Sequence, residues 1–169
     1  KNFAKFAGIK IENVVVCTLD RPRHNDLISS IRSTGARIKL IPDGDVSAVI
    51  ATSIEGSGID MYMGTGGSPE GVLGAAALRC LGGKIYSKLL FYNNEVFERA
   101  QTMGIKDKNT IYTTNDLASG DVMFSATGVT DGTMLKGVHY KNSIATTHSV
   151  VMRSKTNTVR YITANHDLN

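Results

Sequence analysis

The segment Val14-Val15-Val16-Cys17-Thr18-Leu19 is followed by the loop Asp20-Arg21-Pro22-Arg23-His24 and then by an amphipathic stretch from Asn25 to Ser33. The first run is apolar and rich in β-branched residues, which is typical of a buried strand. The amphipathic stretch is typical of a helix that covers a sheet. A strand, a polar loop and a helix in this order indicate an α/β fold.

The same alternation continues along the chain. We expect further strands at Arg37–Ile41, Ile59–Met63, Lys84–Leu90 and Asp121–Thr127, and helices at Val46–Thr52, Pro69–Leu81 and Asn94–Met103. A hairpin with arms Thr147–Ser154 and Thr158–Ala164 is predicted near the end, because the Lys155-Thr156-Asn157 segment between them is polar and suited to chain reversal. The predicted fold class is α/β, a mixed sheet flanked by helices.

Composition limits the class of protein. The chain has 169 residues, 41% of them hydrophobic and only three of them proline, which suits one globular domain. No apolar run is long enough to cross a bilayer. The net charge of +4 comes from scattered basic residues, so binding of nucleic acid is a weak hypothesis. A small phosphorylated ligand is enough to account for the positive charge.

The two cysteines and the first residues of the chain bear on where the protein is located. Cys17 and Cys80 lie in apolar periodic stretches without a C-x-x-C pair, so we expect buried reduced thiols and a cytoplasmic protein. The opening segment, residues 2–8, is predicted to be the end of a helix stopped by Gly8 rather than a signal peptide. We therefore expect that a preceding part of the protein has been removed.

Three predicted strands are each followed by an unusual loop. These loops are residues 20–24, the Pro42-Asp43-Gly44-Asp45 turn and the glycine-rich segment of residues 64–71. In open α/β sheets the carboxyl ends of strands and the N-termini of the next helices meet at one crevice, where ligands bind. The sequence therefore predicts a ligand site at this edge of the sheet.

The first two loops each allow a functional and a structural interpretation. Arg21 and Arg23 flank Pro22, which restricts the backbone before it, so two guanidinium groups could bind a phosphate; a solvated pair neutralised by nearby carboxylates is equally compatible. Asp43, Gly44 and Asp45 could bind sugar hydroxyls through the two carboxylates. Asp45 as a simple N-cap of the following helix is the commoner arrangement for such a turn.

The glycine-rich segment is the strongest of the three. Gly64, Gly66 and Gly67 allow close approach to the backbone, while Ser68 as N-cap and Pro69 at the first helical position would open a helix whose free N–H groups bind anions. Glu70 falls in the first turn, where the helix dipole favours an acid in any case. If Glu70 faces the crevice, its hard oxygen ligands suit Mg²⁺ or Mn²⁺.

The remaining candidates favour structural roles. Only His24 of the four histidines lies near the expected crevice, no two have metal-ligand spacing, and hydrogen-bonded or surface roles are the default. Ser68 lacks the G-x-S-x-G context of a serine hydrolase. Asp131 is interpreted as a turn residue in the loop of residues 128–132.

Taken together, residues 19–24, 42–45, 64–71 and 126–132 resemble the class II fructose-1,6-bisphosphatases in order and spacing. The resemblance covers nearly the whole chain but only the C-terminal portion of the family's usual length. It implies that residues 1–169 form a C-terminal sugar-phosphatase domain, incomplete at its N-terminal side, of the layered α/β lithium-sensitive sugar and inositol phosphatase superfamily.

The resemblance also implies roles for individual residues. Glu70 matches a metal-binding glutamate and Gly67 a substrate-contacting glycine, and residues 21–23 and 43–45 match substrate-binding segments. The family's other metal ligands and the threonine tied to its attacking water lie upstream, so no catalytic residue is assigned in this chain. We assign Arg21 and Arg23 to the distal phosphate.

The implied reaction is hydrolysis of the 1-phosphate of fructose 1,6-bisphosphate to fructose 6-phosphate, with Mn²⁺ or Mg²⁺ as cofactor, in gluconeogenesis and glycerol metabolism. The implied partners are the sugar bisphosphate, the missing N-terminal half and further copies in a homo-oligomer, with neither nucleic acid nor membrane. Three alternatives stay open: a sedoheptulose 1,7-bisphosphatase, a non-catalytic phosphosugar-binding fragment, and nucleic-acid binding with steep salt dependence.

Overall fold

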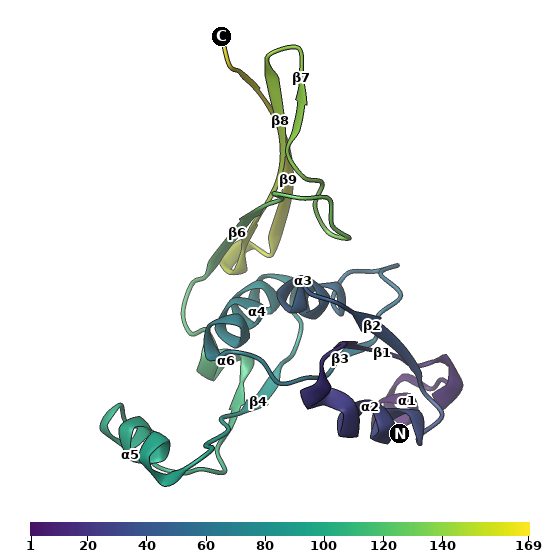
Figure 1. Ribbon diagram of the computed structural model, residues 1–169, viewed down its shortest axis with the longest axis vertical. Helices are drawn as coiled ribbons and strands as arrows, with labels where there is room; N and C mark the ends of the chain where they lie inside the picture. The colour runs from purple at the N-terminus through teal and green to yellow at the C-terminus, as the bar shows by residue number, and fades with distance from the viewer.

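A small parallel sheet forms the N-terminal third of the chain (Figure 1). The computed structural model describes all 169 residues. Strand β1 (Val15–Leu19) lies between β2 (Arg37–Ile41) and β3 (Met61–Tyr62), and both pair with it in parallel. Four of the five β1 residues are buried, as expected for a central parallel strand covered on both faces. The strand predicted from the run of β-branched residues therefore forms the centre of this sheet.

Short helices surround this sheet. They are α1 (Asn2–Ala7), the 3₁₀ turn η1 (Ile11–Asn13), the 3₁₀ turn η2 (Pro22–His24) and α2 (Asn25–Arg32). Gly8 ends α1 in the left-handed conformation at φ 66°, which confirms the expected glycine stop. Val14, Val16, Ile31 and Ala4 form one buried cluster that joins these elements.

Helices α3 (Asp45–Ala51) and α4 (Ser68–Leu81) occupy the centre of the molecule, between the parallel sheet and an antiparallel one (Figure 1). Small residues let α4 pack closely, since Gly74, Ala75 and Ala77 are all buried. Ile50 of α3 and Cys80 of α4 contribute to a second core cluster together with residues of the antiparallel sheet. The core thus ties the central helices to the C-terminal strands.

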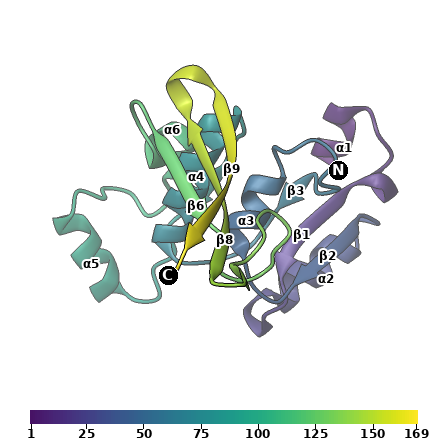
Figure 2. The same ribbon diagram turned by 90° about the horizontal axis from the view of Figure 1, so that it is seen from above.

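An arm extends from the centre of the molecule between residues 86 and 113 (Figures 1 and 2). It contains β4 (Tyr86–Lys88), α5 (Asn94–Thr102) and β5 (Ile111–Thr113), with β4 and β5 paired antiparallel. The next helix, α6 (Thr114–Leu117), returns to pack on α4. A capping box between Thr113 and Asp116 starts α6.

The C-terminal sheet is antiparallel. Strand β8 (Ile144–Arg153) pairs with β6 (Met123–Thr127) and β7 (His139–Lys141) along one edge and with β9 (Thr158–Asp167) along the other. The 3₁₀ turn η3 (Ser154–Thr156) and Asn157, which is left-handed at φ 47°, reverse the chain. The β8–β9 hairpin projects away from the central helices (Figure 1).

The α/β class with parallel and antiparallel pairing flanked by helices is confirmed, although the two kinds of pairing lie in separate sheets. The predicted hairpin and turn are confirmed, but both arms are longer than expected. Strands β5 and β7 and helix α6 were not predicted, and the strand expected at Lys84–Leu90 is only three residues long. These elements are only three or four residues long, too short to show the periodic pattern on which such predictions depend.

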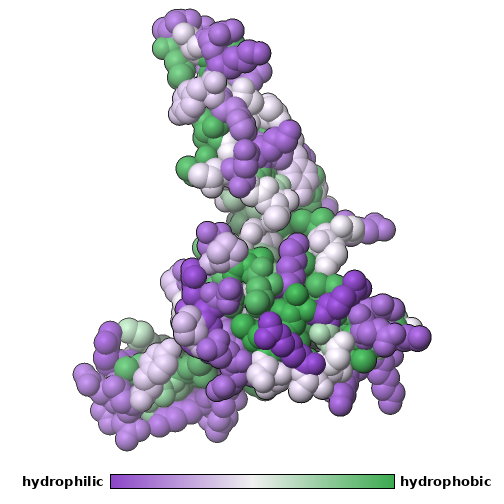
Figure 3. Space-filling view, turned by 45° about the vertical axis from the view of Figure 1, so that its right-hand side comes forward, coloured by the Kyte–Doolittle hydropathy of each residue, from purple (hydrophilic) through white to green (hydrophobic).

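The surface carries open apolar areas over the centre of the molecule and along the hairpin (Figure 3). Exposed apolar side chains include Leu73 of α4 and Ile162 of β9. Cys17 and Cys80 are buried and unpaired, as expected. None of the helices is both long and apolar enough to cross a membrane.

Candidate functional site

The three loops predicted to share a crevice do meet at the carboxyl end of β1. Arg23 and His24 of the first loop both bind the main chain of Thr65 in the glycine-rich loop. Asp45 of the second loop lies against Gly66 of the same segment, because a Cβ built on Gly66 would stand 3.2 Å from its Oδ2 atom. The parallel register of β1 with β2 and β3 produces this meeting, since it places three strand ends at one edge.

The two arginines of the first loop behave differently. Arg21 has an extended backbone, φ −136° and ψ 143°, as the following proline requires. Its guanidinium contacts only the carbonyl oxygen of Asp20, at 3.5 Å. Arg23 donates from Nε to the carbonyl oxygen of Thr65 at 2.9 Å. Neither arginine forms an ion pair within the chain, so both keep charge available for an anion.

The second loop places its two carboxylates in different surroundings. Asp43 is exposed and forms no hydrogen bond. Gly44 is left-handed at φ 79° and is the N-cap of α3, so the expected N-cap role of Asp45 is wrong. Asp45 is instead the first residue of α3; its Oδ1 accepts a hydrogen bond of 2.9 Å from the N–H of Val46, and its Oδ2 faces the glycine-rich loop.

The glycine-rich loop opens α4 one residue earlier than expected. Gly67, extended at φ −71° and ψ 152°, is the N-cap, and no side chain caps the helix. Ser68 is already helical, so its expected N-cap role is wrong, and Pro69 is the second rather than the first helical residue. The N–H groups of the first turn are therefore free of a side-chain cap and remain suited to an anion.

Glu70 is exposed and folds back over the N-cap. A Cβ on Gly67 would overlap the Glu70 carboxylate, so only glycine permits this conformation. The carboxylate makes no hydrogen bond or ion pair in the chain, and its oxygen chemistry fits a hard divalent cation. No group of three or more His, Cys, Asp or Glu side chains is placed to hold a metal ion.

Tyr62 was not among the predicted site residues, although it lies at the end of β3 beside all three loops. Its hydroxyl would be 3.2 Å from a Cβ on Gly64. Burial raises the pKa of Tyr62 to about 12, with a further contribution from the negative charge of Asp45, while Arg23 opposes the shift. The Tyr62 hydroxyl therefore stays a protonated donor next to the crevice at neutral pH.

The remaining histidines lie away from this edge. His139 contacts Asp131 at 3.1 Å on the C-terminal sheet. Asp131 also accepts a 2.9 Å hydrogen bond from the N–H of Gly137. This bond closes the loop that contains Asp131, as its interpretation as a turn residue predicted. That hydrogen bond, with His139 second, lowers the pKa of Asp131.

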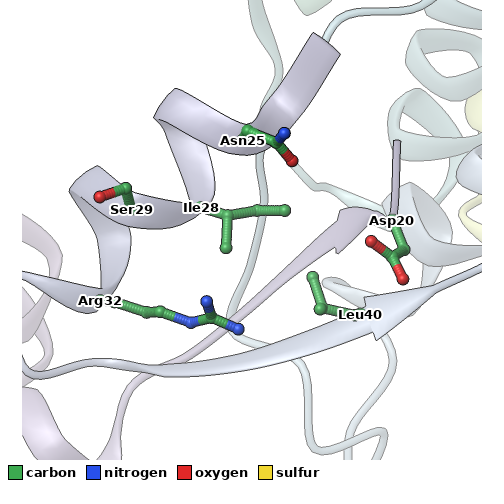
Figure 4. Close-up of a pocket in the computed structure, with 6 residues that line it drawn as sticks. All are labelled: Asp20, Asn25, Ile28, Ser29, Arg32 and Leu40. Atoms are coloured by element: carbon green, nitrogen blue, oxygen red, sulfur yellow. The ribbon is translucent and has the colours of Figure 1, made fainter. Parts of the chain in front are cut away.

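A separate shallow pocket of about 270 Å³ lies beside the first loop, between α2 and β2 (Figure 4). Ile28 and Arg32 of α2 point toward Leu40 of β2 (Figure 4). Its lining is Asp20, Asn25, Ile28, Ser29, Arg32 and Leu40. None of the residues predicted to bind substrate or metal lines this pocket, so the candidate site is the open loop cluster.

Fold and site together define an α/β chain with a cluster of charged and glycine-rich loops at the carboxyl edge of a parallel sheet, where such folds bind phosphorylated ligands. Residues 1–166 match the family described as bacterial fructose-1,6-bisphosphatase, glpX-encoded. The chain belongs to this family.

Curated relatives are similar over nearly the same length. The chain is 43% identical over 170 residues to the D-fructose 1,6-bisphosphatase class 2/sedoheptulose 1,7-bisphosphatase of Crocosphaera subtropica, covering 92% of this chain and 49% of the relative. The protein of the same name from Gloeobacter violaceus is 41% identical over 171 residues, covering 94% of this chain and 49% of the relative. The chain therefore spans about half the length of the curated relatives it matches.

Proposed function

We propose that this chain is the substrate-binding part of a sugar bisphosphatase that hydrolyses the 1-phosphate of fructose 1,6-bisphosphate to fructose 6-phosphate and phosphate in gluconeogenesis. The observation that carries the proposal is the meeting of three loops at Thr65 and Gly66, which joins unpaired guanidinium groups, carboxylates and an uncapped helix start at one edge. The family match supports the reaction class. We also propose that the protein belongs to the lithium-sensitive sugar and inositol phosphatase superfamily and is cytoplasmic.

Each loop has a separate task in this proposal. Arg21 and Arg23 bind the distal phosphate, since their terminal nitrogens are free of ion pairs and guanidinium matches phosphate geometry. Asp43 and Asp45 accept hydrogen bonds from the sugar hydroxyls, with Gly44 providing the turn between them. Gly67 lets the substrate approach the N-terminus of α4.

Glu70 is the chain's one proposed ligand for Mn²⁺ or Mg²⁺. When bound, such a cation neutralises charge on the phosphoryl oxygens and activates a water molecule. The free N–H groups at the start of α4 would stabilise the same developing charge as preorganised donors. As the family resemblance implies, we assign the residues that activate the attacking water to a part of the longer protein that precedes this segment.

We further propose that the rest of a longer protein completes the site and covers part of the open apolar surface (Figure 3). The relatives are about twice as long as the segment they share with this chain, each match covering 49% of the relative. Exposed apolar residues on α4, such as Val72 and Leu73, suit such a contact. Assembly into a homo-oligomer remains a prediction.

Sedoheptulose 1,7-bisphosphate is the second candidate substrate. The names of the relatives from Crocosphaera subtropica and Gloeobacter violaceus include both bisphosphatase activities. Both substrates carry two terminal phosphates, so the charge that the loops recognise is the same. A substrate panel decides between them.

The test is Mn²⁺-dependent phosphate release from fructose 1,6-bisphosphate by this chain alone and by this chain mixed with the remaining half of the enzyme. We expect activity only in the mixture. Glu70→Ala should reduce it by about 100-fold or more, because a lost metal ligand removes transition-state charge stabilisation. Glu98→Ala, an exposed glutamate on the distant α5 arm, is the matched control and should leave the rate unchanged.

Two results would count against the proposal. Full activity of Glu70→Ala would remove the metal-ligand assignment. Absence of activity in a folded and associated mixture, together with binding of the bisphosphate, would favour a non-catalytic phosphosugar-binding module.

A further inference from the structure

His24 is a fully buried histidine at the junction of two loops of the candidate site. It is 1% exposed and ends the 3₁₀ turn that carries Arg23. We propose that His24 is a positioning residue that fastens the first loop to the glycine-rich loop and so sets the affinity of the site for a phosphorylated sugar. This inference rests on the proposed function and adds a residue to it.

Both ring nitrogens of His24 contact the main chain. Nδ1 lies 2.9 Å from the carbonyl oxygen of Leu19, and Nε2 lies 2.9 Å from the backbone nitrogen of Thr65. A carbonyl oxygen can only accept and an amide N–H can only donate, so Nδ1 carries the proton and Nε2 accepts. Nε2 also lies 3.2 Å from the Thr65 carbonyl oxygen, and Nδ1 lies 3.5 Å from Thr18 Oγ1. The ring thus joins the end of β1 to a segment 41 residues further along the chain.

The two neighbouring residues of the first loop hold the same peptide segment from both sides. His24 accepts the N–H of Thr65, while Arg23 donates to its carbonyl oxygen at 2.9 Å. Thr65 precedes the N-cap Gly67 by only two residues, so a shift of Thr65 moves the start of α4. The position of the Arg23 guanidinium and the start of α4 are therefore set by one shared anchor.

Close packing leaves little room for this anchor to move. A Cβ built on Gly64 would lie 3.3 Å from Cε1 of His24 and 3.2 Å from the Tyr62 hydroxyl. A histidine that merely filled space in the core would not need a specific acceptor at Nε2. The hydrogen bond to Thr65 is what distinguishes a positioning role from a filling role.

Two amide substitutions separate these roles. In His24→Gln the side-chain oxygen reaches about as far as Nε2 and can still accept from Thr65, whereas in His24→Asn the amide reaches only the position of Nδ1. Both variants bury a neutral amide at this position in the chain, but only the glutamine amide reaches the Thr65 N–H. We expect only His24→Asn to release the loop.

The first measurement is hydrogen exchange of the Thr65 amide by NMR in the 169-residue chain, which does not depend on any activity. His24→Asn should speed this exchange about tenfold relative to His24→Gln, as expected for one lost hydrogen bond. Equal exchange in both variants would overturn the fastening role. This result stands whether or not the proposed reaction is correct.

The second measurement is the KM for fructose 1,6-bisphosphate in the mixture with the remaining half of the enzyme. We expect His24→Asn to raise KM at least about tenfold and His24→Gln to stay within about threefold, because a displaced Arg23 weakens binding of the unreacted phosphate. A partly unfolded variant would lower kcat and leave KM unchanged, so a fall in kcat alone would refute the positioning role. If the unaltered protein releases no phosphate, the proposed function fails and the exchange result alone decides about His24.

Gly64→Ala is a second variant that avoids changing a buried polar group. Its Cβ would press on the His24 ring and should raise KM in the same direction as His24→Asn. An unchanged KM and unchanged Thr65 exchange in a folded Gly64→Ala protein would contradict the proposal.

Discussion

Gly67→Ala should separate function from stability. A Cβ at this position would overlap the Glu70 carboxylate and lie 3.5 Å from Cδ of Pro69. The backbone, at φ −71° and ψ 152°, is ordinary extended conformation that alanine adopts freely. The overlap is therefore relieved by rotation of the exposed Glu70 side chain and not by movement of the helix.

The expected change in the free energy of unfolding is small because two effects oppose each other. Alanine restricts the unfolded chain, a gain of about 0.4–1 kcal/mol. Alanine is also a poorer N-cap than glycine, a loss of about 0.5–1 kcal/mol. We expect a net change within about 0.5 kcal/mol, measured by urea unfolding of the chain. Phosphate release with the remaining half of the enzyme should fall roughly 10–100-fold, as for other changes that misorient a metal ligand.

Gly71→Ala, one helical position beyond Glu70, is the matched control. A Cβ there meets nothing within 4 Å. The substitution lies inside α4, so it should raise the free energy of unfolding by about 0.5–1 kcal/mol and leave phosphate release unchanged. Full activity of Gly67→Ala alongside an inactive Glu70→Ala would refute the reasoning, because the folded-back carboxylate would then not be the functional conformation. A loss of stability above about 2 kcal/mol would refute the backbone argument.

Two further predictions concern pH. Folding raises the pKa of Tyr62 from 10.0 to about 12, so the folded state holds the hydroxyl proton more tightly than the unfolded state, and this contribution to the free energy of unfolding is lost as pH rises from 10 toward 12. Tyr62→Phe should therefore flatten the fall in the free energy of unfolding over this pH window. An unchanged fall would contradict the burial of the hydroxyl. The Asp116 carboxylate accepts hydrogen bonds from the hydroxyl and from the N–H of Thr113, and these bonds, the hydroxyl first, lower the pKa of Asp116 below 3.8. The carboxylate therefore stabilises the fold above pH 3.8, and this contribution is lost as pH falls through the pKa of the folded state. The stability deficit of Asp116→Asn, measured by urea unfolding, should therefore shrink in acid; a deficit that is constant with pH would argue against the capping box.

Local chemistry was enough to predict most of the regular structure. The apolar run Val14–Leu19 was predicted as a strand and forms β1 at Val15–Leu19, and β2 was predicted with its observed bounds of Arg37–Ile41. Gly8 was correctly expected to end a helix because few other residues tolerate its left-handed backbone. Such features depend on neighbours in sequence, so the sequence by itself determines them.

Helix starts and short edge strands were harder to predict. Ser68 is a better N-cap than Gly67 by intrinsic preference, yet the structure begins α4 at Ser68. With Gly67 as the N-cap, the Glu70 carboxylate packs closely over it. Intrinsic N-cap preferences take no account of such a contact. Strand β7, only three residues long, exists because β8 offers it an edge.

The candidate site shows the same division. The sequence determined which loops carry charge and glycine, and therefore which segments can bind a phosphorylated ligand. Only the tertiary structure decided that Arg23 and His24 share Thr65, that Tyr62 lies beside them, and that Asp45 turns toward Gly66. These contacts join residues far apart in the chain, and they arise because parallel pairing brings the carboxyl ends of three strands to one edge.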